Sequence, residues 1–322
     1  MNNNEIIKWL LKGDVSIQYQ VHLDLLDTER SDLQNRIERE GWAAVFLSKR
    51  HPDGHWGQAF YQPKWISSHY TLCDLRNLYI KPDHQLIQES INNIATLHKT
   101  KDGAINHSTI DGQGDVCVNG MFLNYASYFK TKEEQLRSVV DFILSQRMPD
   151  GGFNCRSNYS GAKHSSLHTT LSVLEGIAEY RLNGYAYRME ELNAAERSAQ
   201  EFILLHQLFI SDRTGEIINK GFLRFAYPRR WKYDILSALD YFQYTGKKWD
   251  DRMQAAIAVL FKKRNATGTW NVQAKHPGQI HFEMEKAGKP SRWNTLRVLR
   301  VLKHFKINKI LYNELIRHHS TT

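Results

Sequence analysis

The most reactive side chains of this sequence stand where predicted helices begin. Asp115 and Cys117 lie at the start of GDVCVNGMF, His168 near the start of SSLHTTLSVLEGI, and Asp234 just before ILSALDYF. The free N–H groups of a helix start favour anionic groups and lower the pKa of a thiol. Asp115, Cys117, His168 and Asp234 are therefore our candidate catalytic residues.

Aromatic and basic residues accompany them at other helix starts. If these starts meet at one rim, the rim combines aromatic rings with a few polar groups, as a small-molecule pocket requires. Arginines of AYPRRWKYD and GKPSRWNTL suit a carboxylate or phosphate through two-pronged contacts. The predicted substrate-binding residues are Trp65, His69, Tyr70, Trp231, Tyr233, Arg230, Arg292 and Trp293.

A repeated turn indicates which elements must position these residues. The turn in QRMPDGGF recurs in weaker form in SKRHPDGHWG, HKTKDGAIN, HQLFISDRTGEI and KKRNATGTWN, about fifty residues apart with one longer interval. Each turn follows a helical pattern and precedes a loop and a second helical pattern. The repeated unit is therefore a pair of helices, and its turn glycines are Gly54, Gly103, Gly151, Gly215 and Gly268.

Two kinds of helix alternate along the chain. One kind, such as EEQLRSVVDFILSQ, is amphipathic with a charged face, and INKILYNELIRHH at 307–319 is its last member. The other kind combines an aromatic or His entry with small residues and leucines. Strand patterns are nearly absent. We predict an all-α fold, an (α/α)6 toroid of six helical hairpins that forms one domain over residues 1–322, with an open superhelix as the alternative.

The turn pattern Q-x-x-x-D-G-G-F resembles the repeats of squalene cyclases and of protein prenyltransferase β subunits, which share an α/α toroid. GDVCVNGMF looks like the prenyltransferase segment that supplies an Asp and a Cys to a catalytic zinc, and SGAKHSSLHTTLSVLEGI like the segment that supplies the His. The resemblance thus implies zinc bound by Asp115, Cys117 and His168, with an open fourth position. Cys155 and His164, in the loop between them, are alternative ligands.

The sequence also departs from both families. The residues before Asp115, STIDGQG, contain no Arg or Lys to bind an isoprenoid diphosphate, Val118 replaces a Tyr, and no D-x-D-D motif occurs. We therefore predict a terpenoid-cyclase-like or prenyltransferase-like enzyme acting on an apolar or anionic small molecule or a thiol. The alternatives are a glycosidase or lyase that uses Asp115 and Asp234 as its carboxylate pair, and a toroid that binds a ligand without catalysis.

The composition restricts the classes of binding partner that we expect. The chain has a formal net charge of +9, but its basic residues are scattered and no nucleic-acid-binding motif occurs, so a small-molecule substrate is expected rather than nucleic acid. No segment is long and apolar enough to cross a bilayer. The start of the sequence lacks a secretion signal and the three cysteines do not suggest a disulfide framework, so we expect a cytoplasmic protein. The sequence identifies no partner subunit.

Overall fold

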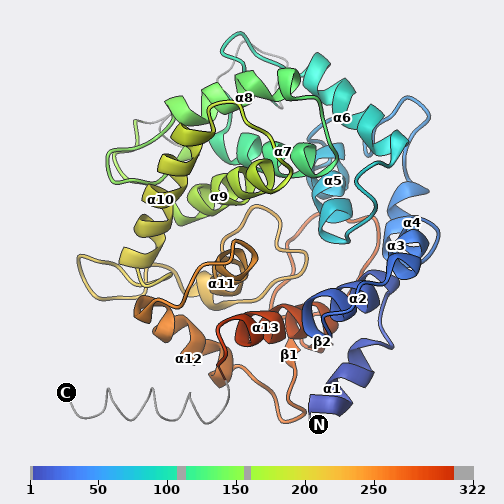
Figure 1. Ribbon diagram of the computed structural model, residues 1–322, viewed down its shortest axis with the longest axis vertical. Helices are drawn as coiled ribbons and strands as arrows, with labels where there is room; N and C mark the ends of the chain where they lie inside the picture. Colours follow the sequence, from blue (N-terminus) through green and yellow to red (C-terminus); the bar gives the residue numbers. More distant parts are fainter. Residues whose placement is uncertain (1–2, 107–113, 156–160, 308–322) are drawn as a thin grey trace.

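Helices make up most of the regular structure, which confirms the all-α expectation. The computed structural model describes residues 3–106, 114–155 and 161–307 (Figure 1). The helix predicted at 307–319 lies outside the described residues, apart from Ile307. Within the described part, the two strands are β1 (Trp270–Asn271) and β2 (Pro290–Ser291), which pair antiparallel and bring the start of α13 next to a repeated turn.

One set of helices lies around the middle of the molecule (Figure 1), and each of them contributes residues to the cavity described below. Most of their surfaces are buried, which explains why their sequences show small residues and leucines rather than one polar face. They are α2 (Val15–Gln20), α5 (Ser68–Asn77), α7 (Val116–Tyr128), α9 (Leu167–Leu182), α11 (Ile235–Tyr244) and α13 (Arg292–His304).

The amphipathic helices lie outside these six in the same view. They are α1 (Asn3–Leu10), α3 (Ser31–Ile37), α4 (Gly41–Leu47), α6 (Gln85–Leu97), α8 (Glu133–Ser145), α10 (Met189–Leu205) and α12 (Gln254–Lys262). The sequence pattern did not single out α1 as a member of this set. Its Ile6 and Leu10 are fully buried in the common core, so α1 also packs an apolar face against the rest of the protein.

The repeated turns have a common structural reason. All five turn glycines have positive φ, between 70° and 97°, a region that glycine enters without strain. A Cβ on Gly103 would meet Ser138 of α8, and a Cβ on Gly151 would meet Ser198 of α10. Each of these two turns thus packs against the outer helix of the next pair.

The aromatic residue after the turn also plays a repeated part. Trp56 and Trp270 each follow a turn glycine by two positions, and both are buried. Their indole N–H groups donate to the carbonyls of Phe46 and Leu260, at 2.7 Å in both cases. The tryptophans therefore tie a turn to the end of the preceding outer helix.

Close packing of α7 against α9 fixes the spacing of two inner helices. A Cβ on Gly120 would lie 2.7 Å from the carbonyl oxygen of Ser172, and one on Gly176 would lie 2.4 Å from that of Gly120. Only glycine permits this approach.

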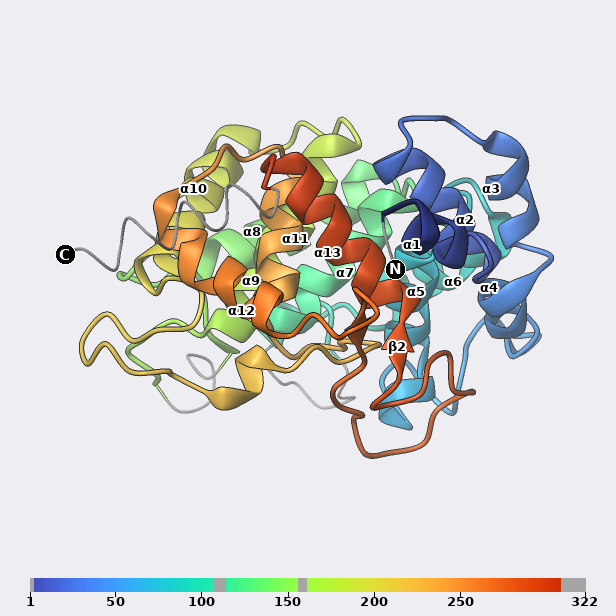
Figure 2. The same ribbon diagram turned by 90° about the horizontal axis from the view of Figure 1, so that it is seen from below.

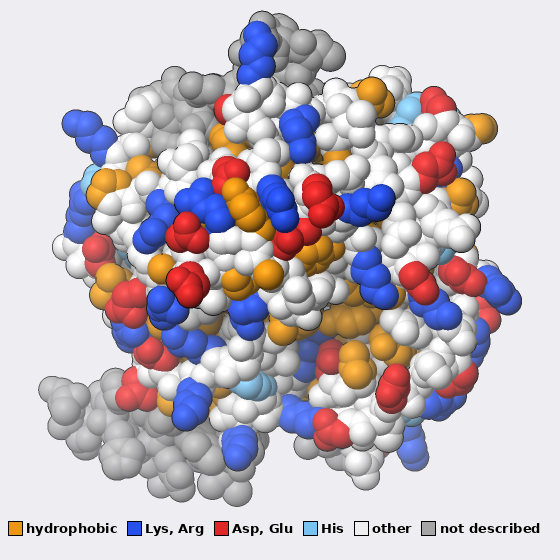
Figure 3. Space-filling view, turned by 45° about the horizontal axis from the view of Figure 1, so that its top comes forward, with side chains coloured by type: hydrophobic (Ala, Val, Ile, Leu, Met, Phe, Trp, Pro, Cys, Tyr) orange, Lys and Arg blue, Asp and Glu red, His pale blue; other side chains and the backbone are white. Residues whose placement is uncertain are grey.

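The long connecting loops 206–234 and 263–291 gather on one face of the molecule (Figure 2). This is the face on which α11 and α13 begin. Elsewhere the surface carries intermixed Lys, Arg, Asp and Glu side chains, as the face in Figure 3 illustrates.

Candidate functional site

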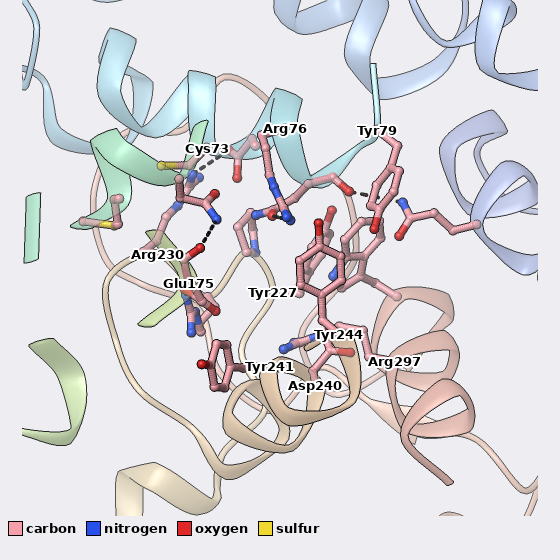
Figure 4. A pocket seen from close by; sticks show the side chains of 18 of the residues that line it. Cys73, Arg76, Tyr79, Glu175, Tyr227, Arg230, Asp240, Tyr241, Tyr244 and Arg297 are labelled. Carbon is pink, nitrogen blue, oxygen red and sulfur yellow. Dashed lines mark hydrogen bonds and ion pairs between the residues drawn. The ribbon is translucent and has the colours of Figure 1, made fainter. Parts of the chain in front are cut away.

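A cavity lies between the six inner helices and is closed on one side by the loop that carries Tyr227, Arg229 and Arg230. It leaves about 110 Å³ that the centre of a water molecule can reach. Its lining is rich in arginine, tyrosine and carboxylate (Figure 4). The lining residues are Gln20, Tyr70, Cys73, Asp74, Arg76, Asn77, Tyr79, Met121, Asn124, Glu175, Tyr227, Pro228, Arg229, Arg230, Asp240, Tyr241, Tyr244, Trp293, Arg297 and Arg300.

Two loop arginines reach carboxylates of the inner helices. Arg230 Nη1 lies 2.6 Å from Asp74 Oδ2 of α5, and Arg229 Nη2 lies 2.5 Å from Glu175 Oε2 of α9. The Arg230 guanidinium also lies 5.8 Å from the ring centroid of Tyr70. Because each arginine presents five N–H groups and uses one of them in the named contact, both keep donors for a ligand.

A second ion-pair network closes the wall made by α11 and α13. Asp240 accepts hydrogen bonds from Arg297 Nε at 2.8 Å and from Arg300 Nε and Nη2 at 2.6 Å. Arg300 also bonds Asp24, at 2.9 Å, on the π-helical turn that follows α2. This network connects α13 to the turn that follows α2. Each charged group in it is paired with an opposite charge.

Arg76 differs from the other cavity arginines because its environment is mainly aromatic. Its guanidinium lies 5.3 Å from the ring centroid of Tyr244, 5.6 Å from that of Tyr128 and 6.0 Å from that of Tyr79. One Nη donates to Glu179, whereas the buried Nε has no hydrogen-bond partner among the described residues. A buried guanidinium N–H without a partner is costly unless a ligand or water satisfies it.

Two carboxyl groups of the cavity have opposite protonation behaviour. Burial raises the pKa of Asp74, and the Arg230 guanidinium offsets this only in part. Burial would also raise the pKa of Asp240, but Arg300 and Arg297 outweigh it and hold the value at about 2. Asp74 is therefore the better proton donor, and Asp240 stays a carboxylate.

Three of the predicted substrate-binding residues line this cavity: Tyr70, Arg230 and Trp293. Trp65 and Trp231 lie beside it, in a small apolar cluster with Tyr70 and Met121. Lys64 covers that cluster, with Nζ 5.1 Å from the Trp65 centroid and 5.4 Å from that of Trp231.

The remaining predicted binding residues make contacts within the protein. His69 is buried, and its Nδ1 lies 3.4 Å from the hydroxyl of Tyr125. Tyr233 is buried and donates to the carbonyl of Leu208 at 2.7 Å. Arg292 donates to the carbonyl of Trp9 at 3.0 Å and covers its ring. The side chains of His69, Tyr233 and Arg292 thus stabilise the fold around the cavity.

The predicted catalytic residues lie at helix starts, as expected, but do not line the cavity. Asp115 is the N-cap residue of α7 and Cys117 lies in its first turn, where its backbone N–H donates to Cys155 Sγ at 3.0 Å. His168 lies in the first turn of α9, and its Nδ1 accepts the N–H of Tyr233 at 2.7 Å. Burial, with Arg229 and Lys232, lowers the pKa of His168 to about 4.

Asp234 has a structural position. It is buried and caps α11, accepting the N–H of Ser237 at 2.8 Å and its hydroxyl at 3.0 Å. Burial raises its pKa.

Among the described residues, no group of side chains matches the zinc site predicted from the sequence. Among the residues that the structure describes, no three His, Cys, Asp or Glu side chains form a group that could hold a metal ion. His164 is exposed, and its Nε2 lies 3.2 Å from an Arg213 nitrogen. Zinc at Asp115, Cys117 and His168 therefore stays a prediction.

Sequence reasoning missed most of the cavity. Asp74, Arg76, Glu175 and Asp240 lie in the interior of inner helices rather than at their starts. The signal was nevertheless present, because a charged residue on a helix that is buried on most sides needs a partner or a ligand.

Comparisons with known proteins add little to this geometry. No family model and no curated protein matches the chain. Among solved structures, the chain is similar to a type II terpene cyclase from Scytonema in complex with its product, merosterolic acid A. The two are 13% identical over 85% of this chain and 96% of that chain, with a TM-score of 0.31. None of the described helices is long and apolar enough to span a membrane.

Proposed function

We propose that the chain forms an (α/α)6 toroid whose central cavity binds a small polar molecule carrying an anionic group, and that it is an enzyme acting by proton transfer. The order of inner and outer helices supports the toroid. The observation that carries the function is the cavity lining, where Arg76, Arg229 and Arg230 keep N–H donors beside tyrosines and the protonatable Asp74.

The size of the cavity favours a compact ligand. One water needs about 10–15 Å³ by this measure, so the cavity has room for roughly eight water-sized groups. That is the scale of an acidic sugar or a small organic acid, and the arginines of the lining favour such an anionic ligand over an apolar one of similar size. An anion-bearing sugar also agrees with the carbohydrate-active alternative, with Asp74 and Glu175, which both line the cavity, as the carboxylate pair in place of Asp115 and Asp234.

The Asp74–Arg230 pair links ligand binding to proton transfer. When Asp74 is protonated, Arg230 loses its counter-charge and attracts an anionic ligand group. When Asp74 then gives its proton to the ligand, the carboxylate pairs with Arg230 again. Asp74 is thus the general acid of the proposal, and Arg230 and Arg76 hold the ligand.

Thermal unfolding with a small ligand panel tests the proposal. We expect glucuronate and glucose 6-phosphate to raise the Tm, whereas glucose does not, because a ligand stabilises the fold by mass action only if it binds. The gain should be larger at pH 5.5 than at pH 7.5, since a raised Asp74 pKa leaves more of this group protonated at the lower pH. Stabilisation by farnesol instead of the acidic sugars would contradict the proposal.

A matched variant controls for lost stability. Arg230→Gln alone leaves Asp74 buried without a counter-charge, so the double variant Asp74→Asn/Arg230→Gln removes both charges together. We expect its affinity for glucuronate to fall about tenfold or more, the usual effect of losing a charged hydrogen bond. An unchanged affinity would exclude the cavity as the site.

A terpenoid-cyclase-like reaction is the second candidate. The apolar cluster of Trp65, Tyr70 and Met121, with Trp231 packed on it, is the observation that favours it. Farnesol-dependent stabilisation that Trp231→Ala abolishes would support this candidate over the first.

A further inference from the structure

Two of the three cysteines meet at the face where α7 and α9 begin, outside the central cavity. Cys117 lies in the first turn of α7, and Cys155 lies at the end of the turn that follows Gly151. All three cysteines are free thiols, and all are partly exposed. The third, Cys73, lines the cavity instead and provides an internal control.

The contact between them is direct. The backbone N–H of Cys117 donates to Cys155 Sγ at 3.0 Å. Given ordinary bond lengths, the N–Sγ distance limits the two Cα atoms to a separation of at most about 7.3 Å, close to the upper end of the disulfide range. Disulfides commonly span about 4.4–6.8 Å between Cα atoms, so a bond between these cysteines needs little backbone movement.

The surroundings single out Cys155 as the attacking sulfur. Its Sγ accepts the Cys117 N–H at the start of a 13-residue helix, and it accepts the hydroxyl of Thr169 at 3.6 Å. Donors aimed at one sulfur stabilise negative charge on it. Cys117 lies next to Cys155, so its sulfur is close to the Cys155 sulfur once that sulfur has been oxidised.

We propose that Cys117 and Cys155 form a reversible disulfide when the protein meets a peroxide. The Cys155 sulfur attacks one peroxide oxygen, the O–O bond breaks, and Cys155 becomes a sulfenic acid as one water leaves. The Cys117 sulfur attacks that sulfenic sulfur, its proton leaves with the hydroxyl as a second water, and the S–S bond forms. Two thiols and one hydrogen peroxide thus give one disulfide and two waters.

The bond would link two repeats of the fold. It joins the start of α7 to the turn that leads into α9, so oxidation cross-links the face on which these helices begin. The inference does not depend on the proposed cavity ligand.

Mass spectrometry of the full chain treated with hydrogen peroxide tests this inference. We expect the mass to fall by about 2 Da, two of the three thiols to be lost, and dithiothreitol to restore both. Digestion should yield one cross-linked product that joins the peptide of Cys117 to that of Cys155, with Cys73 still reactive toward iodoacetamide. A linkage that includes Cys73, or addition of oxygen without a cross-link, would overturn the inference.

Variants sharpen the result. Cys73→Ser should form the disulfide as the wild type does, whereas Cys155→Ser should lose the 2 Da decrease while its circular dichroism stays that of a folded helical protein. If Cys155→Ser does not fold, the cross-link map of the wild type and of Cys73→Ser still decides the question.

Discussion

The central cavity and the face where α7 and α9 begin both gather reactive residues, but they hold them differently. In the cavity, Asp240 is fixed by two arginines, and Asp74 faces one. At the helix starts, Cys117 and Cys155 contact each other, and His168 bonds a backbone N–H. Ion pairs between side chains therefore shape the cavity, whereas hydrogen bonds from backbone N–H groups hold Cys155 and His168 at the helix starts. A motif search along the sequence selects residues at the helix starts and misses the ion pairs of the cavity.

The largest expected difference is in stability. Asp240→Asn leaves Arg297 and Arg300 without their shared carboxylate, and breaking a buried ion pair costs about 3–5 kcal/mol. Asp115→Asn, at the helix start, keeps an N-cap side chain and should cost less than about 1 kcal/mol. Urea unfolding of the two variants measures this difference in unfolding free energy. Equal losses of stability in both variants would contradict the difference proposed between the cavity and the helix starts.

The two regions should also lose stability in different pH ranges. The pKa of His168 is about 4 in the fold against an ordinary 6.5, so its neutral form stabilises the fold above pH 6.5, and this contribution falls as the pH drops toward 4. The shift corresponds to about 3 kcal/mol. His276 and His281 have similar values, also lowered first by burial, and share this range.

His168→Gln isolates this contribution. The difference in unfolding free energy between the wild type and His168→Gln should shrink by about that amount from pH 7 to pH 4. A constant difference over this range would show that His168 titrates normally in the folded protein.

The contribution of Asp240 to stability should be lost at a lower pH than that of His168. Its pKa of about 2 lies below the ordinary value of 3.8, so its stabilising carboxylate is fully present above pH 4 and is lost as the pH falls toward 2. The contribution is about 2.5 kcal/mol. Comparing Asp240→Asn with the wild type at pH 5 and pH 2.5 measures it, and a gap that does not narrow would refute the assignment.

A smaller loss of stability is expected where α7 packs against α9. Gly176→Ala puts a methyl group against the carbonyl of Gly120 and should cost about 1–3 kcal/mol through overpacking. Thermal unfolding measures the loss. A neutral or stabilising substitution would show that the helices are less closely packed.

The smallest effect is expected for metal removal. The residues that the structure describes form no three-ligand group, and on this geometry treatment with a chelator leaves the Tm unchanged. Close to one equivalent of zinc in protein purified without chelator, lost in Cys117→Ala, would restore the zinc prediction made from Asp115, Cys117 and His168.

The repeat pattern predicted the all-α class and most helices, because turn glycines and helical periodicity are local signals. Gly54 and Gly151 lie in turns with positive φ, as the repeated pattern predicted. The cavity was harder to predict. Asp74 and Arg230 are 156 residues apart, and Arg300 and Asp24 are 276 apart, so only the three-dimensional arrangement of the helices reveals these pairs. Tyr70, Arg230 and Trp293 were found because they lie near helix starts.

The most direct test of the central claim compares glucuronate binding in two variants by isothermal titration calorimetry at pH 5.5. The account predicts that Asp74→Asn/Arg230→Gln, in the cavity, loses at least about tenfold in affinity, while His168→Gln, at the start of α9, binds as the wild type does. Binding that survives the first change and is lost with the second would contradict it and place the site at the helix starts.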